Sequence, residues 1–253
     1  MQFADHFSTH ARAYADSRPG YPPELFRWLS AACRGHRLAW DAACGNGQAS
    51  GALAAYFEQV FASDASAQQI AAARPQPRVR YAVEAAEACT LKDESADLIT
   101  VAQAWHWFDR PRFAEEVRRV LRPGGVFAAF NYGLSTVAPE VDALFLHLYH
   151  DLLGGDWPPE RRFAVDEFST LPLPVPALDE APKLRIDCQW NLAQYLAYLR
   201  SWSASQRYRE RTGQDPIDLL GADFAKAWVD PERLRTVSWP LTLRAARKPE
   251  RAA

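Results

Sequence analysis

The sequence predicts an α/β fold with a doubly wound, mostly parallel sheet of seven strands. Short apolar runs alternate with helical patterns between residues 38 and 130. A loop with two glycines follows the first of these runs, and residues 97–102 form an almost continuous apolar run, as in a parallel strand covered on both faces. With 253 residues, 48% of them hydrophobic, the chain can form one such domain with a large core.

The elements before the sheet are predicted to be helical. Aromatic rings recur at helical spacing within residues 3–14, which indicates a first helix. The segment 17–23 contains three prolines and a glycine and breaks this helix. Pro22 and Pro23 are well placed to begin a second helix, which we expect to end near Cys33.

The next hundred residues predict the alternation of a doubly wound sheet. Asp64 ends the second strand, prolines 75 and 77 stop the helix that follows, and Asp109 can cap a later helix. Strands are expected at 38–42, 60–63, 79–83, 97–102 and 126–130, and helices at 48–56, 67–73 and 109–121.

After residue 131 the pattern changes. Helices are expected at 140–153, 192–203 and 218–228, with a proline-rich surface loop at 171–182. Two strands, 184–190 and 237–246, should complete the far edge of the sheet, while the helices form a lid over the strand ends. We therefore expect one domain, 1–253, made of a helical arm (1–35), a cofactor-binding core (36–131), a lid or substrate insertion with an edge strand (132–235) and a final strand (236–247).

The composition argues against several function classes. The net charge is −2, which gives no global electrostatic case for nucleic acid, and the basic cluster at residues 244–251 is interpreted as a solvated tail. None of the four cysteines forms a Cys-x-x-Cys pair, so neither a zinc site nor a disulfide framework is expected. Asp5, His6 and His10 occupy the place where a signal peptide needs an apolar core, and no run is long enough to span a bilayer. We expect a cytoplasmic monomer or homodimer that binds a small molecule, with no metal and no nucleic-acid or membrane partner.

The residues after the strands indicate the ligand. Ligands of such sheets bind at the carboxyl ends of the strands, where Gly45 and Gly47 follow strand one and Asp64 ends strand two. An acid there can accept the hydroxyls of a ribose. NAD-binding loops need a third glycine, but Ser50 stands in its place. Asp41 beside the loop would repel a pyrophosphate, whereas S-adenosylmethionine carries a sulfonium and an ammonium and no phosphate.

The segment Asp-Ala-Ala-Cys-Gly-Asn-Gly-Gln at 41–48 resembles the cofactor loop of class I S-adenosylmethionine-dependent methyltransferases, which have a Rossmann-like fold. Four further segments follow in that family's order: 86–87, 95–98, 102–108 and 121–125. The segments 14–22 and 198–203 are similar to the small-molecule branch that includes the trans-aconitate methyltransferases. The resemblance covers nearly the whole chain, with two departures: Ala43 replaces a frequent glycine, and Ala85 replaces an aspartate near the adenine.

The resemblance implies roles for residues around the cofactor. The methionine part would be surrounded by Asp41, Ala43, Gly45 and Gly47, and Asp64 with Ala65 would hold the ribose. Ala86 and Glu87 would border the adenine, although Glu87 could equally be an exposed loop charge. Gln103 would meet the methionine ammonium. Tyr14, Arg18 and Tyr21 would close from the N-terminal arm, with Arg18 on the methionine carboxylate, unless Arg18 is solvated beside a proline turn.

The acceptor side is assigned to aromatic and polar residues. Trp105, Trp107 and Trp202 would form its walls with Ser201, and Arg200 would hold a carboxylate unless it is a surface residue. His106 has three interpretations: an orienting donor for an already ionised carboxylate, a general base for a phenol or carbon acid, or a structural histidine.

The sequence therefore predicts methyl transfer from S-adenosylmethionine to a small molecule, with S-adenosylhomocysteine as the product. A carboxylate acceptor, as in trans-aconitate, is the leading hypothesis. The alternatives are C-methylation of a quinone-type ring, and a non-catalytic protein that binds S-adenosylmethionine; an oxidoreductase is an outside possibility that the late Gly51 disfavours.

Overall fold

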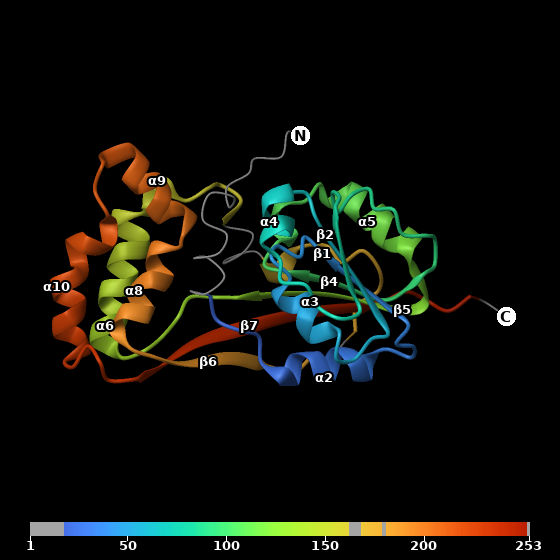
Figure 1. The fold of residues 1–253 in the computed structure, drawn as a ribbon, viewed down its shortest axis with the longest axis horizontal. Helices are drawn as coiled ribbons and strands as arrows, with labels where there is room; N and C mark the ends of the chain where they lie inside the picture. Colours follow the sequence, from blue (N-terminus) through green and yellow to red (C-terminus); the bar gives the residue numbers. More distant parts are fainter. Residues whose placement is uncertain (1–17, 162–167, 179–180, 252–253) are drawn as a thin grey trace.

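A seven-stranded sheet forms the centre of the computed structural model, which describes residues 18–161, 168–178 and 181–251 (Figure 1). The strands are β1 (Leu38–Ala42), β2 (Gln59–Asp64), β3 (Val79–Val83), β4 (Ala96–Ala102), β5 (Leu121–Tyr132), β6 (Leu184–Trp190) and β7 (Arg235–Arg247). The main helices are α2 (Pro23–Ala32), α3 (Gln48–Leu53), α4 (Ala67–Ala72), α5 (Arg110–Val120), α6 (Pro139–Leu146), α8 (Leu192–Arg200), α9 (Ser203–Thr212) and α10 (Pro216–Trp228). The helix predicted at residues 3–14 lies outside the described ranges.

The strands follow the order β3-β2-β1-β4-β5-β7-β6. Strands β1 to β5 pair in parallel, whereas β7 is antiparallel to both β5 and β6, so the sheet is mixed. The direction of strand succession reverses between β1 and β4, and sheets of this type bind ligands in a crevice at the carboxyl ends of the strands at such a reversal. Asp41 and Asp64 lie at the carboxyl ends of β1 and β2, and Gln103 directly follows β4.

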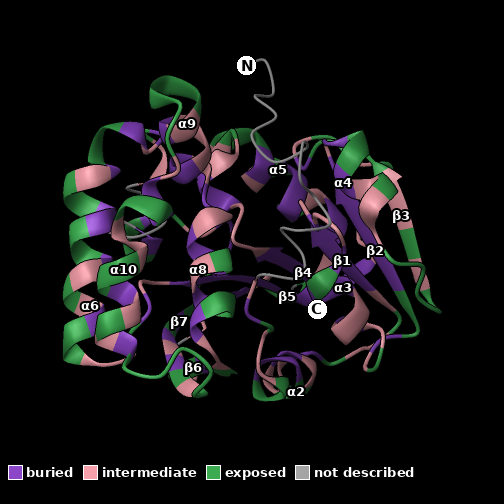
Figure 2. Cartoon of the chain, turned by 60° about the vertical axis from the view of Figure 1, so that its left-hand side comes forward, coloured by how far each residue is buried: buried purple, intermediate pink, exposed green. Residues whose placement is uncertain are grey.

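Alternate strand residues pack into two apolar clusters, one on each face of the sheet. Leu98 and Phe130 point into the cluster that includes α2 and α3, whereas Ile99 and Phe127 point into the cluster that includes α5. The burial pattern in Figure 2 shows the central strands buried between these layers. Strand β4 is buried at six of its seven positions, as predicted for a strand covered on both faces.

Helices α6, α8, α9 and α10 form a group, called here the helical group, that lies beyond the end of β5 (Figure 1). Hydrogen bonds join it to the sheet: Trp239 Nε1 donates to the Tyr198 hydroxyl at 3.1 Å, and the hydroxyls of Ser135 and Tyr195 lie 3.3 Å apart. The apolar cluster under α2 continues without a break into this group. The helical group and the sheet therefore share one hydrophobic core.

Two predicted helices differ in detail. The helix expected at 140–153 is α6 followed by a π-helical turn, His147–Leu152. The helix expected at 192–203 ends at Arg200, and α9, which was not predicted, follows it. Helix α9 was missed because its sequence is mostly polar and buries only Ala204, Ser205 and Tyr208, so it has no continuous apolar stripe.

The basic C-terminal segment is not a solvated tail, as the sequence had suggested. Arg247 donates to the carbonyl oxygens of Gly124 and Ala32, and the Lys248 ammonium donates to those of Arg118 and Leu121. These bonds use side-chain cations to satisfy backbone carbonyls at the end of α2, in α5 and in the first part of β5. The segment therefore fixes β7 to the end of the sheet at which β5 begins, opposite the crevice.

Asp97 is the central polar residue at that opposite edge. Its side chain is 2% exposed, and Oδ2 accepts hydrogen bonds from the backbone N–H groups of Arg37 (2.8 Å) and Leu38 (3.0 Å). Its Oδ1 forms an ion pair with Arg122 at 2.7 Å. One carboxylate thus ties the start of β1 to β4 and to the turn within β5.

We predict that Asp97→Ala lowers the free energy of unfolding by about 3 kcal/mol, because it removes the ion-pair partner of Arg122 and the acceptor of two partly buried N–H groups. Urea denaturation measures this change. The matched control is Asp187→Ala, which breaks an ion pair to Arg185 whose two side chains are 45% and 63% exposed. That control should cost less than about 1 kcal/mol. Equal losses in the two variants would contradict the prediction.

Candidate active site

The loop between β1 and α3 has an unusual backbone. Ala43, Gly45 and Gly47 all have positive φ angles, of 54°, 56° and 87°. A Cβ atom added at Gly47 would lie 2.2 Å from the Tyr81 hydroxyl, so only glycine fits there. Ala43 adopts this left-handed conformation without being glycine, at a cost of about 1 kcal/mol.

Asp64 holds this loop from the end of β2. Its Oδ2 accepts a hydrogen bond from the Gly45 N–H at 2.8 Å, and its Oδ1 accepts one from the Ser66 N–H at 2.8 Å. A carboxylate only accepts hydrogen bonds and has about four acceptor positions, which suits it to the hydroxyl groups of a ligand. Ala65 lies half-buried between Asp64 and Ser66.

Asp41 is fully buried beneath the loop. Its carboxylate accepts hydrogen bonds from the hydroxyls of Ser50 (2.5 Å) and Thr100 (3.0 Å), which come from α3 and β4. Burial raises its pKa to about 6, although the two hydroxyls act in the opposite direction. Ser50 occupies the place of the glycine that NAD-binding loops require, and its partnership with Asp41 was not foreseen from the sequence.

Two side chains at the carboxyl end of β4 carry solvent-shielded polar atoms. Gln103 has a φ of 59°, and its Nε2 atom has no hydrogen-bond partner among the described residues. His106 lies in a short 3-10 helix, Trp105–Trp107, and its Nδ1 likewise has no described partner. Buried polar atoms are rarely left unpaired, so both atoms are candidates for contact with a ligand or with water.

Burial also determines the protonation of His106. It lowers the pKa of the imidazole to about 3, and the positive charge of Arg161 contributes in the same direction. The ring is therefore neutral at physiological pH. Its neighbour Trp107 lies against it, with 4.7 Å between the ring centroids.

The residues predicted to border the adenine lie together near the start of α5. Ala86 is buried, and the Glu87 carboxylate accepts a hydrogen bond from the Asp109 N–H at 2.9 Å. Asp109 in turn caps α5 by accepting from the Arg112 N–H. Glu87 is therefore a structural link and not merely a solvated loop charge.

The described part of the N-terminal arm packs against both the core and the helical group. Arg18 donates to the Tyr132 hydroxyl (3.3 Å) and to the Ser201 carbonyl (3.5 Å), and its guanidinium lies 5.4 Å from the centroid of the Tyr198 ring. Tyr21 packs edge-on against Phe130. Arg18 is thus neither free nor solvated. Tyr14, the third predicted residue of the arm, lies outside the described ranges.

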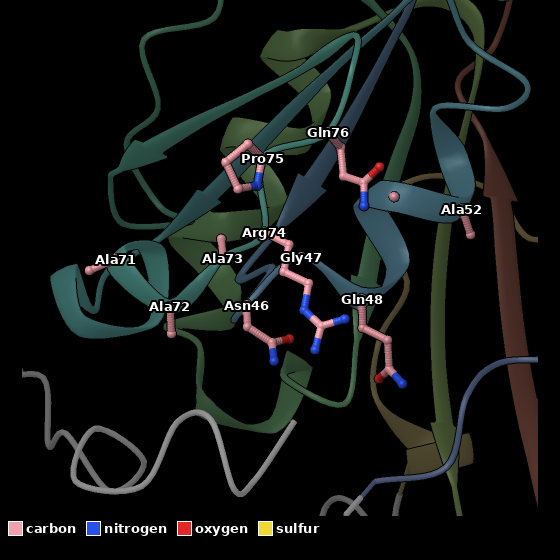
Figure 3. Close-up of a pocket in the computed structure, with 11 residues that line it drawn as sticks. Asn46, Gly47, Gln48, Ala52, Ala71, Ala72, Ala73, Arg74, Pro75 and Gln76 are labelled. Atoms are coloured by element: carbon pink, nitrogen blue, oxygen red, sulfur yellow. The ribbon is translucent and has the colours of Figure 1, made fainter. Parts of the chain in front are cut away.

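Gln48 provides a further tie from the glycine loop to the arm, because its side-chain amide donates to the Pro19 carbonyl at 3.1 Å. Beside this loop, between α3 and the segment that follows α4, lies a cavity of about 840 Å³. Figure 3 shows the Arg74 guanidinium in this cavity between Asn46 and Gln48. Neither Gln103 nor His106 lines it, so this cavity is separate from the end of β4.

Trp105, which the sequence predicts to be a wall of the acceptor site, is packed within the core. Its side chain is 2% exposed and packs in the core against Phe127 and Phe168, with ring centroids 5.5 and 5.8 Å away. Arg244 covers another side of the ring at 5.5 Å. Its indole is part of the hydrophobic core, where large aromatic side chains are commonly buried.

Arg200 is likewise not brought to the site. Its guanidinium pairs with Asp218 at 2.5 Å and Asp215 at 3.4 Å, at the start of α10. These ion pairs neutralise the positive charge of Arg200 within the helical group. The predicted role of Arg200 as a holder of a substrate carboxylate is therefore not supported by the structure.

The neighbours of Arg200 have different surroundings. The Ser201 hydroxyl donates to the Tyr198 carbonyl at 2.6 Å. Trp202 is buried and packs against Tyr149 and Trp157, with ring centroids 6.0 and 5.4 Å away. Neither Tyr149 nor Trp157 was singled out from the sequence. Tyr149 lies in a π-helical turn and Trp157 in the extended segment that follows, and neither belongs to a motif that would mark it as functional.

The family pattern described as a methyltransferase domain matches residues 40–129 of this chain. A Dictyostelium discoideum protein named as a methyltransferase is 31% identical over 256 residues, covering 98% of this chain and 96% of that protein. A Mycobacterium tuberculosis protein named as an uncharacterized methyltransferase is 38% identical over 120 residues, 47% of this chain and 49% of that protein.

Solved structures show the same similarity. A structure from Anaeromyxobacter dehalogenans, described as that of a type II methyltransferase, is 49% identical, with a TM-score of 0.86 over 92% of this chain and 99% of that one. The S-adenosylmethionine complex of phosphoethanolamine N-methyltransferase 2 from Haemonchus contortus has a TM-score of 0.52 at 17% identity, covering 96% of this chain and 57% of that one. The second likeness shows the fold alone.

The strand order and the glycine loop define a class I, Rossmann-like methyltransferase fold. The chain belongs to the methyltransferase domain family and is an S-adenosylmethionine-dependent methyltransferase, as the sequence predicted. No helix within the described ranges is both long and apolar enough to cross a membrane. In the same ranges, no group of three or more His, Cys, Asp or Glu residues could hold a metal ion.

We predict that Asp41→Asn raises the stability of the ligand-free protein at pH 7. The pKa of Asp41 is raised from 3.8 to about 6, so the folded state binds the proton more tightly than the unfolded state. Stability from this group is therefore lost as pH rises from about 4 to 6, by about 3 kcal/mol in total. Urea denaturation of both proteins between pH 4 and 7 measures it. A stability difference between them that stays constant across this range would contradict the prediction.

Proposed function

We propose that this methyltransferase transfers the methyl group of S-adenosylmethionine to a carboxylate oxygen of a small molecule, as in the trans-aconitate methyltransferases. The observation that carries the proposal is the buried, neutral His106 with its unpartnered Nδ1 at the end of β4. An imidazole with a pKa of about 3 is a poor base near neutral pH. An acceptor that is already ionised, such as a carboxylate, needs no base.

The residues around the glycine loop suit S-adenosylmethionine. Asp64 has acceptor capacity for the ribose hydroxyls, and the positive-φ backbone at Gly45 and Gly47 allows a ligand to approach the chain closely. The shielded amide of Gln103 would meet the methionine part, with Arg18 on its carboxylate. Ala86 and the neighbouring Glu87 would border the adenine.

When bound there, S-adenosylmethionine would supply an electrophilic methyl group on a sulfonium. His106 would hold the acceptor oxygen through a hydrogen bond and move no proton. The helical group would act as a lid that excludes water and fixes the acceptor in line with the methyl group, since alignment dominates the rate of such a displacement. Methylation of a carboxylate conserves protons: the oxygen gains the methyl group, and the electron pair of the broken C–S bond stays on sulfur.

We predict that Asp64→Ala weakens binding of S-adenosylhomocysteine by about 2–3 kcal/mol, roughly 30- to 150-fold in Kd. The loss combines the ribose contacts with the tether to the Gly45 N–H. Isothermal titration calorimetry measures it, with NAD as the comparison ligand. Tight binding of NAD by the wild type, without heat from S-adenosylhomocysteine or S-adenosylmethionine, would refute the cofactor assignment.

A separate prediction concerns the chemistry. With a carboxylate acceptor, the wild-type rate should be nearly flat from about pH 6 to 9, because the acceptor stays ionised throughout. His106→Gln, which keeps a hydrogen-bonding group of similar reach, should stay within about tenfold of wild type, whereas loss of a needed base costs about a hundredfold or more. The assay uses labelled S-adenosylmethionine and a panel of small carboxylic acids, phenols and quinols.

The same assay separates the competing chemistries. A steep rise in the wild-type rate through pH 7, abolished in His106→Gln, would refute the carboxylate mechanism. It would favour a phenol, quinol or carbon acceptor, including C-methylation of a quinone-type ring.

A further inference from the structure

Arg161 is held against aromatic rings beside the helical group. Its guanidinium lies 4.9 Å from the centroid of the Trp157 ring and 5.9 Å from that of Tyr149, and its Nε donates to the Tyr149 hydroxyl at 3.3 Å. Tyr149, Trp157 and Trp202 pack on one another, with ring centroids 4.7 to 6.0 Å apart, and are called here the aromatic wall. The wall fixes the direction of the guanidinium.

The charge of Arg161 is not neutralised by the described part of the chain. Its two terminal nitrogens have no hydrogen-bond acceptor and no acidic partner among the described residues. Three other arginines of the helical group do form ion pairs with aspartates: Arg200, Arg209 and Arg211. Arg161 thus differs from these three in having donors left for a ligand, and it is only partly exposed.

The aromatic wall leads from Arg161 to the carboxyl ends of the central strands. Trp202 packs against Tyr198, with 5.6 Å between ring centroids, and the Tyr198 ring lies under the Arg18 guanidinium. Arg18 reaches the Tyr132 hydroxyl at the end of β5, next to the end of β4. The positive charge of Arg161 also lowers the pKa of His106, which places the guanidinium within electrostatic range of the imidazole.

We propose that Arg161 binds an anionic group of the methyl acceptor, a carboxylate or a phosphate, and so determines which small molecules are methylated. The proposal rests on the proposed function, because it assigns a recognition residue to the same site. A guanidinium binds such groups with two parallel hydrogen bonds, and the surrounding rings strengthen the contact by reducing the local dielectric. Arg161 takes the role that the sequence had assigned to Arg200.

The test compares wild type with Arg161→Met and Arg161→Lys on acceptors that differ in charge. The probes are hexanoate, adipate, tricarballylate, 3-phosphonopropionate and the neutral trimethyl ester of tricarballylate, each with labelled S-adenosylmethionine. Arg161→Met should lower kcat/KM for the best acid by at least about 30-fold, mainly through KM, and Arg161→Lys should retain more activity than Arg161→Met. The Kd of S-adenosylhomocysteine should stay within twofold in all variants.

Arg185→Met is the matched control. Arg185 is an exposed arginine of β6 that pairs with Asp187, so its loss should change kcat/KM by less than twofold. A preference for the phosphonate over the dicarboxylate would identify a phosphate as the recognised group, and the reverse would identify a carboxylate. Either preference supports the proposal only if Arg161→Met removes it.

A second readout separates failure of this proposal from failure of the proposed function. Thermal stabilisation of the S-adenosylhomocysteine-loaded enzyme by 10 mM tricarballylate or 3-phosphonopropionate reports binding without turnover. If acids are methylated equally well by Arg161→Met, Arg161 is not the recognition residue, although carboxylate methylation stands. A different result is that no acid is methylated, but the anions stabilise the wild type and Arg161→Lys and do not stabilise Arg161→Met. In that case anion binding by Arg161 stands and carboxylate methylation is refuted. If neither methylation nor Arg161-dependent stabilisation occurs, both fall.

Discussion

The buried carboxylate of Asp41 is the constraint on which the cofactor side of this molecule depends. It sits at the end of β1 and binds the hydroxyls of Ser50 on α3 and Thr100 on β4, so three elements meet at one charged group. Burying that charge costs stability, which the raised pKa records. In return, Asp41 fixes α3, which directly follows the glycine loop, and Asp64 holds the loop itself through the Gly45 N–H. The loop backbone is therefore preorganised for a ligand.

The side of the molecule on which we propose that the acceptor binds is organised by a different interaction. Aromatic rings and guanidinium groups connect the end of β5 to the helical group, beginning with Arg18 between Tyr132 and Tyr198. These contacts are continuous with the core, so the helical group shares its stability with the sheet. A site between the two would combine an acceptor's recognition groups from the helices with a cofactor loop from the strands.

Local pattern was sufficient for most of the fold and for the cofactor loop. A buried parallel strand such as β4 needs a continuous apolar run, and the run itself was visible. Gly47 could be predicted as a loop residue because glycine is typical of tight loops. The structure gives the reason: its left-handed conformation and the contact with Tyr81 exclude other residues. Helix α9 could not, because it is held by packing at three positions and its polar sequence carries no periodic signal.

The sequence by itself determined the order of the strands along the chain, the glycine loop and the position of Asp64, because each follows from residues that are neighbours in the chain. Only the tertiary structure decided which of two arginines, Arg200 or Arg161, is paired with aspartates. Arg200 and Arg161 are the same residue type in the same segment, but the fold brings the aspartates of α10 to Arg200 and aromatic rings to Arg161. That difference depends on the packing of helices distant in sequence, which no local pattern records.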